Sequence, residues 1–583
     1  MAGYLKKEKG NNKMERLSSR WEYRWAGFWG QVYKRQVLLF VLLLVFFFEV
    51  IAWSDQAPIL LTFDLHVDPV NNGFPAAGKA GAFQERTEWM QWVLDQTEPY
   101  AIPMSFLSGG WYMERVVSEE PPGGGAVLVR RMYETGGQIG SHHHKEFRAS
   151  SFNWPSMESD ASLPEVRKQW EDNINWVDAG IQKALELDPP VTADINGINR
   201  IKGAHSPQDE SDYHQLMTEF GFDVREPGPE EDYYGYFGHH IWHPYRPSAA
   251  NYLGEDLSAS FVQVPSGPVI GYETIHHGTL QDMRPASMKR QLLQIYLNWR
   301  HANHTDAGSK VWTWGWGSHA TDFEPSSVSR AALVEMLPWI ENHFRNRIEP
   351  NSASVLQYAT HLDVADAYLS WETENPGVSS FTFDSLIVED WTTYPWLQPV
   401  AKEMQDYLWH SDLDMADVSA FKLERDGSDA VLLYNDGMTP VAVDLEFIFP
   451  GRIQVIGLQS GAVLSGTTGV LPDGLLVMDE PLWVTAIDLL LGDANGDGVI
   501  DVADLGILGA NYGMTDVIFP DGDFNGDGVV DIADLGVLGA YWSSSSLSDM
   551  LGMQDTEQNV SIPEPAILSL FTISMLVIAS RRR

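Results

Sequence analysis

Three patterns of apolar and polar positions follow one another along the chain. Between Ile59 and about Glu372, short apolar runs of strand length alternate with segments of helical periodicity. This alternation predicts a βα architecture, in which strands and helices take turns along the chain. The first predicted strand is Ile59–Phe63, and the clearest predicted helices are Arg86–Leu94, Glu165–Leu187 and Pro285–Arg300.

The second pattern covers residues 430–490, where strand-like runs are separated by turns of Gly, Asn, Asp and Pro. Such spacing is typical of a small β-sandwich. Residues 373–429 form an unassigned connecting region, while Ser543–Ser546 mark a linker over residues 543–560. The predicted strands of the sandwich are Ala430–Tyr434, Val441–Phe447, Ile453–Leu458, Leu475–Met478 and Trp483–Ile487.

The two ends of the chain have the pattern of export signals. A leader rich in Lys and Arg precedes the apolar run Val37–Phe48, and a Val-x-Ala site ends at Ala52, which predicts a signal peptide over residues 1–52. A retained signal anchor is the alternative, since the leader is long. At the other end, the apolar segment Ala566–Ala579 precedes Arg581–Arg583, which predicts a short membrane segment with a positive stop.

Length and composition limit the classes of protein to consider. A chain of 583 residues exceeds one core of ordinary size, so two or three folded units with appendages are expected. The net charge of -42 argues against nucleic acid as a partner, because phosphate binding relies on clustered Lys and Arg. The absence of cysteine excludes disulfides, zinc–thiolate sites and a thiol nucleophile.

Two segments near the C-terminus repeat one arrangement of oxygen-bearing side chains. They occupy positions 1, 3, 5, 9 and 12 of a loop, with Gly498 and Gly528 at position 6. Calcium takes six to eight oxygen ligands, and glycine at position 6 permits the sharp turn that gathers them. An acidic surface loop would not reproduce this spacing twice. The predicted calcium ligands are Asp493, Asn495, Asp497, Val499, Asp501, Asp504, Asp523, Asn525, Asp527, Val529, Asp531 and Asp534.

Two polar clusters in the βα region are candidates for a catalytic metal site. Asp64 and His66 follow the first predicted strand, and the segment 136–146 contains His142, His144 and Glu146. Carboxylates just past a strand, together with imidazoles, suit a divalent cation that activates water. Each cluster also has a simpler explanation, as a run of surface histidines or as an aspartate that caps a turn.

In their order along the chain, these clusters resemble the NodB-homology polysaccharide deacetylases, carbohydrate esterase family 4. Thr62-Phe63-Asp64 matches the first motif of that family and Gly136–His142 the second, while Gly203–Pro207 lies where the third is expected. The family also has a histidine near the end of a strand later in the chain, and the segment Trp312–His319 provides one in His319. The resemblance implies an α/β fold, a distorted (β/α) barrel over residues 57–372, and hydrolysis of N-acetyl groups on a polysaccharide.

Three positions depart from that family: Leu65 replaces a second Asp, Glu146 a metal-binding His, and His205 an Arg. The resemblance still implies a role for each matched position. Asp64 is the expected base and His319 the expected acid. Five further histidines, at positions 239, 240, 243, 276 and 277, are expected in loops, with a place near the site as the alternative. The expected ligands of Zn²⁺ or a similar divalent transition metal are His66, His142, His144 and Glu146, and the expected substrate-binding residues are His205, Trp314 and Trp316.

Two further resemblances concern the C-terminal part. Asp at position 12, with a helix predicted after each loop, makes residues 491–542 resemble a type I dockerin, a module that binds two Ca²⁺ and docks a cohesin on another protein. Residues 561–583, with Pro563-Glu564-Pro565 before the apolar stretch, resemble the PEP-CTERM sorting signal, which an exosortase processes. This second resemblance implies export through the inner membrane of a Gram-negative bacterium, to the cell surface or beyond.

One leading hypothesis and two rivals follow. The leading one is an exported, surface-attached, metal-dependent carbohydrate N-deacetylase or a related polysaccharide hydrolase. The first rival is a catalytically inactive carbohydrate-binding protein, since three motif positions are altered. The second rival is a scaffold whose dockerin-like module is its functional part, which predicts tight binding to a cohesin-like partner.

Overall fold

The computed structural model describes much of the chain between Ala57 and Trp542. The predicted signal segments, 1–52 and 561–583, lie outside the described residues, as does the linker 543–560. No helix among the described residues is long and apolar enough to cross a bilayer. Within 57–542 the residues that are not described are 68–75, 120–123, 143, 145, 156–160, 204–208, 227–242, 251–254, 266, 268, 277–278, 306–310, 350–353, 379–403, 405–406, 436–438, 446, 450–452, 459–462, 466–474, 478–479, 487–490, 496–498, 516 and 518.

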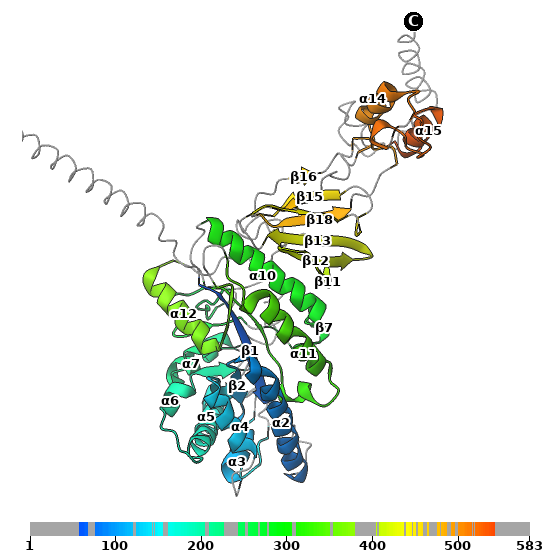
Figure 1. Cartoon of the computed structure of the whole chain (residues 1–583). Coiled ribbons are helices and arrows are strands. Elements are labelled where there is room, and N and C mark those ends of the chain that lie inside the picture. Colours follow the sequence, from blue (N-terminus) through cyan, green and yellow to red (C-terminus); the bar gives the residue numbers. More distant parts are fainter. Residues whose placement is uncertain are drawn as a thin grey trace, which may run out of the picture. The chain divides into compact units, whose positions relative to one another are not determined.

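A curled sheet of eight parallel strands forms the centre of the N-terminal region, as a (β/α) barrel requires (Figure 1). Its main path runs β10-β1-β2-β3-β4-β5-β6, and β9 also pairs with β1. Past the end of β6, Gly317 N donates to Gly267 O at 2.7 Å, which joins that segment to the end of β9. The strands are β1 Ile59–Val67, β2 Ser105–Ser108, β3 Gln138–His142, β4 Ile201–Gly203, β5 Val224–Arg225, β6 Val262–Gln263, β9 Thr313–Trp316 and β10 Leu356–Ala359.

Helices lie between these strands in sequence, as the alternating pattern predicts. The predicted helices 86–94, 165–187 and 285–300 correspond to α2, α5 and α10, which confirms their type and approximate place. A short antiparallel hairpin, β7 Glu273–His276 with β8 Thr279–Asp282, precedes α10. The helices are α2 Ala76–Thr97, α3 Gly110–Ser118, α4 Gly124–Glu134, α5 Leu163–Leu185, α6 Ile195–Ile198, α7 Glu210–Phe220, α10 Pro285–Thr305, α11 Val328–Ile340 and α12 His361–Glu374.

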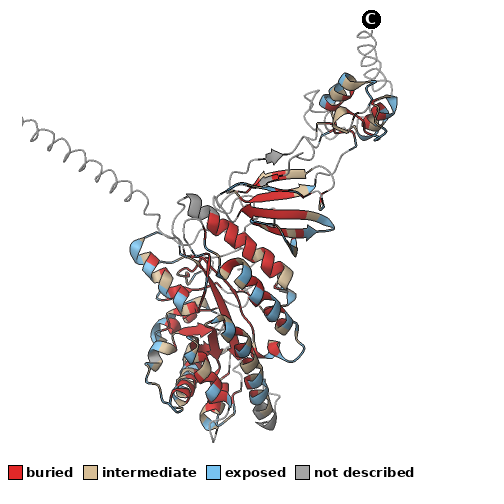
Figure 2. Cartoon of the chain, in the orientation of Figure 1, coloured by how far each residue is buried: buried red, intermediate tan, exposed pale blue. Residues whose placement is uncertain are grey.

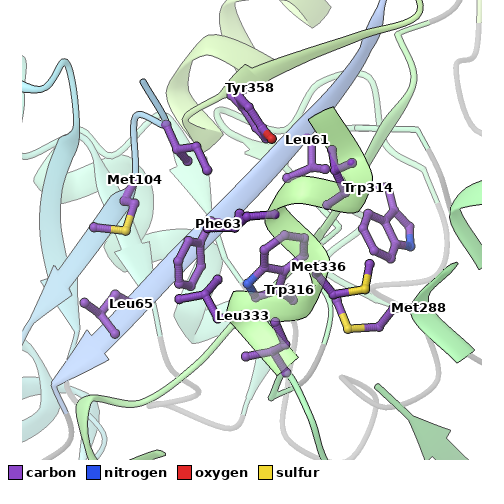
Figure 3. Close-up of a cluster of buried hydrophobic side chains, with 14 of the residues drawn as sticks. Leu61, Phe63, Leu65, Met104, Met288, Trp314, Trp316, Leu333, Met336 and Tyr358 are labelled. Atoms are coloured by element: carbon purple, nitrogen blue, oxygen red, sulfur yellow. The ribbon is translucent and has the colours of Figure 1, made fainter. Parts of the chain in front are cut away.

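The two faces of β1 have different chemistry, because successive side chains of a strand point to opposite faces. Leu61, Phe63 and Leu65 face the main apolar core, where Phe63 packs against Trp316 with ring centroids 5.4 Å apart (Figure 3). Thr62, Asp64 and His66 alternate with them and are also buried. The strand is therefore covered on both faces (Figure 2), and its polar residues all point to one of them.

That second face is apolar where the strands begin and polar where they end. Leu60, Ile201 and Val224 belong to a separate buried cluster to which α12 contributes Val364 and Tyr368. Asp64 and His66 lie further along β1, toward the carboxyl ends of the parallel strands. Catalytic residues of (β/α) barrels lie at this edge, so the fold places the polar pair where chemistry is expected.

A β-rich region follows, and it begins earlier than the sequence indicates. β11 Leu408–Leu413 and β12 Val418–Arg425 lie in the segment left unassigned, and the six-stranded antiparallel sheet has the order β11-β12-β13-β18-β15-β16. A two-stranded sheet, β14-β17, shares a buried apolar cluster with it. The remaining strands are β13 Ser428–Asn435, β14 Val441–Val443, β15 Ile453–Gly457, β16 Val463–Ser465, β17 Leu475–Val477 and β18 Leu482–Ala486.

The last described unit contains two equivalent helices, α14 Val502–Asn511 and α15 Ile532–Tyr541. Gly492, before the first loop, packs so closely on Leu538 of α15 that a Cβ would lie 3.2 Å from its Cα. Gly522, before the second loop, packs in the same way on Leu508 of α14, at 2.8 Å. Each loop thus rests on the helix that follows the other loop, so the two halves form one folded unit.

Candidate metal centre

Asp64 and His66 lie on β1, which continues to Val67 and therefore past the predicted strand end at Phe63. Both side chains are buried on the same face. Asp64 is opposite Ser105 of β2, and His66 forms a bridge with His319 beyond β9. Because β1 extends through Val67, Asp64 and His66 are both paired with β2, and the sheet fixes the directions of their side chains.

Glu226 is the third member of this group, and the sequence analysis missed it. His66 Nε2 lies 3.1 Å from Glu226 Oε2 and 3.2 Å from Asp64 Oδ1. These three donor atoms all lie within 4.8 Å of one another, and the three residues are buried. Glu226 directly follows the short strand β5, and Asp223 and Arg225 interrupt the apolar pattern before it. No apolar run like Ile59–Phe63 therefore marked its position in the sequence.

The protonation equilibria of the three groups are strongly linked. Burial and the charge of Asp64 raise the pKa of Glu226 to about 8, although His66 opposes the shift. Burial is the largest influence on Asp64 and acts to raise its pKa, but the charges of His66 and His361 and the hydrogen bonds with His66 and Glu226 together lower this pKa below its ordinary value. For His66, burial acts to lower the pKa, and the two carboxylates raise it well above the ordinary range. Without a metal ion, the site therefore favours a protonated Glu226 beside an ionised Asp64.

The donor set of Asp64, His66 and Glu226 fits a divalent cation. Ligand atoms about 2.0–2.2 Å from an ion lie roughly 3.0–3.5 Å from each other in octahedral or tetrahedral geometry. The observed separations from His66 Nε2 are 3.1 and 3.2 Å. Glu226 Oε1 is buried and has no hydrogen-bond partner among the described residues. Two carboxylates and an imidazole suit Zn²⁺ or a related transition metal.

His142 and His144 lie beside this group without joining it. The rings of His142 and His66 are 4.4 Å apart between centroids, and His142 is buried at the end of β3. His142 Nε2 lies 3.3 Å from His144 Nε2. The structure thus places all three expected metal-binding histidines close together, with His66 nearest to the carboxylates.

Glu146 has a different environment from the one the sequence suggests. Its Oε2 accepts a hydrogen bond of 3.0 Å from His144 N, and its backbone oxygen accepts one from Asn173 of α5. Burial raises the pKa of Glu146 to about 7, and burial lowers the pKa of the neighbouring Lys202 to about 7. Glu146 is absent from the described group of converging donors. Its contacts support the loop that carries His144.

His319 lies at the open edge of the site. Its ring is edge-on to His66 at 5.7 Å, and its side chain is 34% exposed. His319 Nδ1 is 2.9 Å from Asp322 Oδ2, so the carboxylate holds the tautomer with the proton on Nδ1 and leaves Nε2 able to exchange a proton. Asp322, three residues further on, was not among the residues expected from the sequence.

The tryptophans expected to bind substrate belong to the core. Trp314 and Trp316 are 5% and 0% exposed and pack with Phe63 and Met336 (Figure 3). This placement corrects the expectation, because a ring enclosed by apolar neighbours has no face for a sugar. His243 is also structural: its Nδ1 lies 2.8 Å from Val311 O. The positions 205, 239, 240 and 277 lie outside the described residues.

The second predicted calcium loop has the expected turn and inward oxygens. Asp523 Oδ2 accepts from Gly528 N at 2.8 Å, and Asn525 Oδ1 accepts from Asp527 N at 2.9 Å. Gly528 has a φ of +80°, which a non-glycine residue rarely adopts. At position 12, Asp534 is buried and accepts from the backbone of Asn525. In the first loop, residue 497 lies outside the described residues, while Asp504 accepts from Asn495 N as its counterpart does.

Comparisons with known proteins are weak. No known protein family and no curated protein matches the sequence. A solved structure described as a polysaccharide deacetylase from Mycobacterium smegmatis has 14% identity and a TM-score of 0.33, and covers 55% of this chain and 93% of its own. A mutant of a CE4 family pseudoenzyme with restored enzymatic activity has 10% identity and a TM-score of 0.24, with coverages of 53% and 69%. At these values neither structure assigns the chain to a family.

Gly317 offers a direct test of the centre. A Cβ at this position would lie 2.6 Å from Asp64 Oδ1, so Gly317→Ala must displace that carboxylate. We expect zinc affinity to fall about 10–100-fold, the usual effect of disturbing the support of a ligand, as measured by isothermal titration calorimetry. Gly81→Ala, where no atom lies within 4 Å of the added Cβ, should leave the affinity unchanged. Equal affinities in both variants would exclude Asp64 from the centre.

The raised pKa of Glu226 predicts how stability depends on pH. A carboxyl whose pKa rises from 4.5 to about 8 on folding binds its proton more tightly in the folded state. The free energy of unfolding of the metal-free protein should therefore decrease as pH rises from 5 to 8. Glu226→Gln should become progressively more stable than the wild type over this range, as measured by thermal unfolding with a chelator present. The exposed variant Glu85→Gln should show no such trend.

Proposed function

We propose that the chain is an exported, surface-attached, metal-dependent carbohydrate N-deacetylase or a related polysaccharide hydrolase. The observation that carries the proposal is the buried convergence of Asp64, His66 and Glu226 at the carboxyl edge of the parallel sheet. Two carboxylates and an imidazole are costly to bury together unless a cation offsets their charge. A site of this kind is suited to hydrolysis of an amide or ester.

Each residue of the centre has a role in this proposal. Asp64, His66 and Glu226 hold the cation, since their donor atoms converge, and His142 and His144 form the wall beside them. A divalent cation supplies Lewis acidity, which polarises a carbonyl oxygen and acidifies water. Asp64 lies among the ligand atoms, so proton transfer falls to His319 and not to Asp64.

His319 is suited to proton transfer because Asp322 orients its ring and part of it reaches solvent. The imidazole takes a proton from the attacking water, and Asp322 stabilises the imidazolium that results. The same proton then passes to the nitrogen that leaves from the carbonyl carbon. Acetate and a free amino sugar are the products of this sequence.

The C-terminal unit is proposed as a calcium-dependent attachment module. The inward oxygens of Asp523 and Asn525 and the turn at Gly528 support the calcium role. Its proposed partner is a cohesin-like protein, and residues 561–583 are proposed as a sorting tail that an exosortase removes. The enzyme would then act while tethered at the cell surface.

The catalytic proposal is tested with N-acetylglucosamine oligomers, by measuring acetate release and bound zinc. Glu226→Gln should lose both, because it removes a donor to the cation. His319→Gln should retain zinc and lose about 10²–10⁴-fold in kcat, the usual contribution of a general acid or base.

The exposed variant His410→Gln should match the wild type in both measurements. A wild type that binds zinc but hydrolyses none of these oligomers, nor other acetylated glycans, would favour a carbohydrate-binding protein. Activity that survives in Glu226→Gln would contradict the proposed centre.

Calcium binding is tested by titration of the full-length protein. The wild type should bind two Ca²⁺ in the C-terminal module and Asp523→Ala one, because the first ligand of the second loop is lost. Asp414→Ala, an exposed acidic residue outside the module, should still bind two. The same stoichiometry in all three proteins would reject the loop assignment.

A further inference from the structure

A buried histidine and a buried serine lie close to Asp64, and the histidine approaches the carboxylate oxygen that His66 does not. His361 has no exposed surface, and its Nε2 is 3.7 Å from Asp64 Oδ2. Its Nδ1 is 2.9 Å from Ser105 Oγ, and its backbone N donates to the same oxygen at 3.1 Å. Neither His361 nor Ser105 was singled out by the sequence. The pair therefore connects the candidate metal centre to the start of α12.

The sheet and the helix together fix this arrangement. Asp64 and Ser105 are register partners on β1 and β2, while Thr62 pairs with Ala359 at the end of β10. Thr360 caps α12 by accepting from Asp363 N. Leu362, which follows His361, donates its backbone N–H to Oε1 of Gln138 on β3. The first turn of α12 is thus tied to two strands, and His361 has little freedom to rotate away.

The hydrogen bonds select one tautomer of His361. Ser105 Oγ already accepts from the backbone N of His361, so its own hydrogen can be donated to Nδ1. With Nδ1 as acceptor, the neutral ring carries its proton on Nε2. The opposite tautomer would point a lone pair of Nε2 at the ionised carboxylate of Asp64, which is repulsive in a buried site. The favoured tautomer directs an N–H toward Asp64 Oδ2.

We propose that His361 is a positioning residue, which holds Asp64 through Nε2–H so that the other oxygen, Oδ1, faces His66 and Glu226. This inference rests on the proposed metal centre and adds the group that orients one of its ligands. Carboxylates that bind metal ions commonly have such partners, and loss of a partner costs about 10–100-fold in affinity. The separation of 3.7 Å is longer than a hydrogen bond, so the proposed contact requires His361 Nε2 and Asp64 Oδ2 to come about 0.5 Å closer.

A purely structural role predicts something different. If His361 only fills space and satisfies Ser105, then removing its N–H changes stability and leaves metal affinity as it was. If it orients Asp64, then affinity depends on an N–H at the position of Nε2. Glutamine can place an amide N–H near that position, whereas leucine fills the space without a donor.

The test is a titration of the full-length protein with Co²⁺, followed by its visible absorption and by calorimetry. His361→Gln should bind Co²⁺ within about threefold of the wild type, and His361→Leu about 10–100-fold more weakly. Equal weakening in both variants, or none in either, would overturn the positioning role. Thermal unfolding of the metal-free variants shows which of them are folded.

Ser105→Ala provides a second route if His361→Leu does not fold. It removes the hydrogen-bond partner that selects the tautomer while it leaves the imidazole in place, and we expect a loss of about three- to tenfold in Co²⁺ affinity. Unchanged affinity in Ser105→Ala would contradict the tautomer argument. A wild type that binds no Co²⁺ would reject the metal centre itself, and the positioning role with it, whereas a binding wild type with unaffected variants rejects the positioning role alone.

Discussion

The burial of two carboxylates beside an imidazole is the interaction on which the candidate centre depends. Asp64 and Glu226 both approach His66 Nε2, in a region with little access to water. Charges in such a place are costly unless they are paired or bind a cation. Proton uptake by Glu226 is one way to reduce this cost, and a divalent ion is the other. The same three side chains are thus a liability to the metal-free fold and the basis of the proposed chemistry.

The strand period places these groups where they meet. On β1, Leu61, Phe63 and Leu65 anchor one face in the main core, so the residues between them must point the other way. A shift of one residue in register would exchange the two faces and bury the carboxylate among tryptophans. The apolar packing seen in Figure 3 therefore holds the polar residues in position from the opposite side of the strand.

The remaining units have simpler organisation. The antiparallel sheet of the β-rich region packs one face on the β14-β17 sheet, while Phe421, Tyr434 and Trp483 on the other face join the core that includes α10. In the C-terminal unit, Gly492 and Gly522 allow each loop to rest on the helix after the other. Because each loop packs on the helix of the other half, both loops are supported by one small apolar core.

The sequence by itself determined features that depend on local chemistry. The βα alternation, the β-rich stretch and the position-6 glycine of the second loop follow from periodicity and backbone conformation, as does the side-by-side placement of Asp64 and His66. The tertiary structure decided which distant residues join them. Glu226 and His361 lie 160 and 295 positions after His66, and no local pattern relates such residues. Likewise, Trp314 and Trp316 have the composition of a sugar platform, but the face of β9 on which they lie packs against helices. Only the folding of the sheet shows which face is enclosed, because burial depends on neighbours that are remote in sequence.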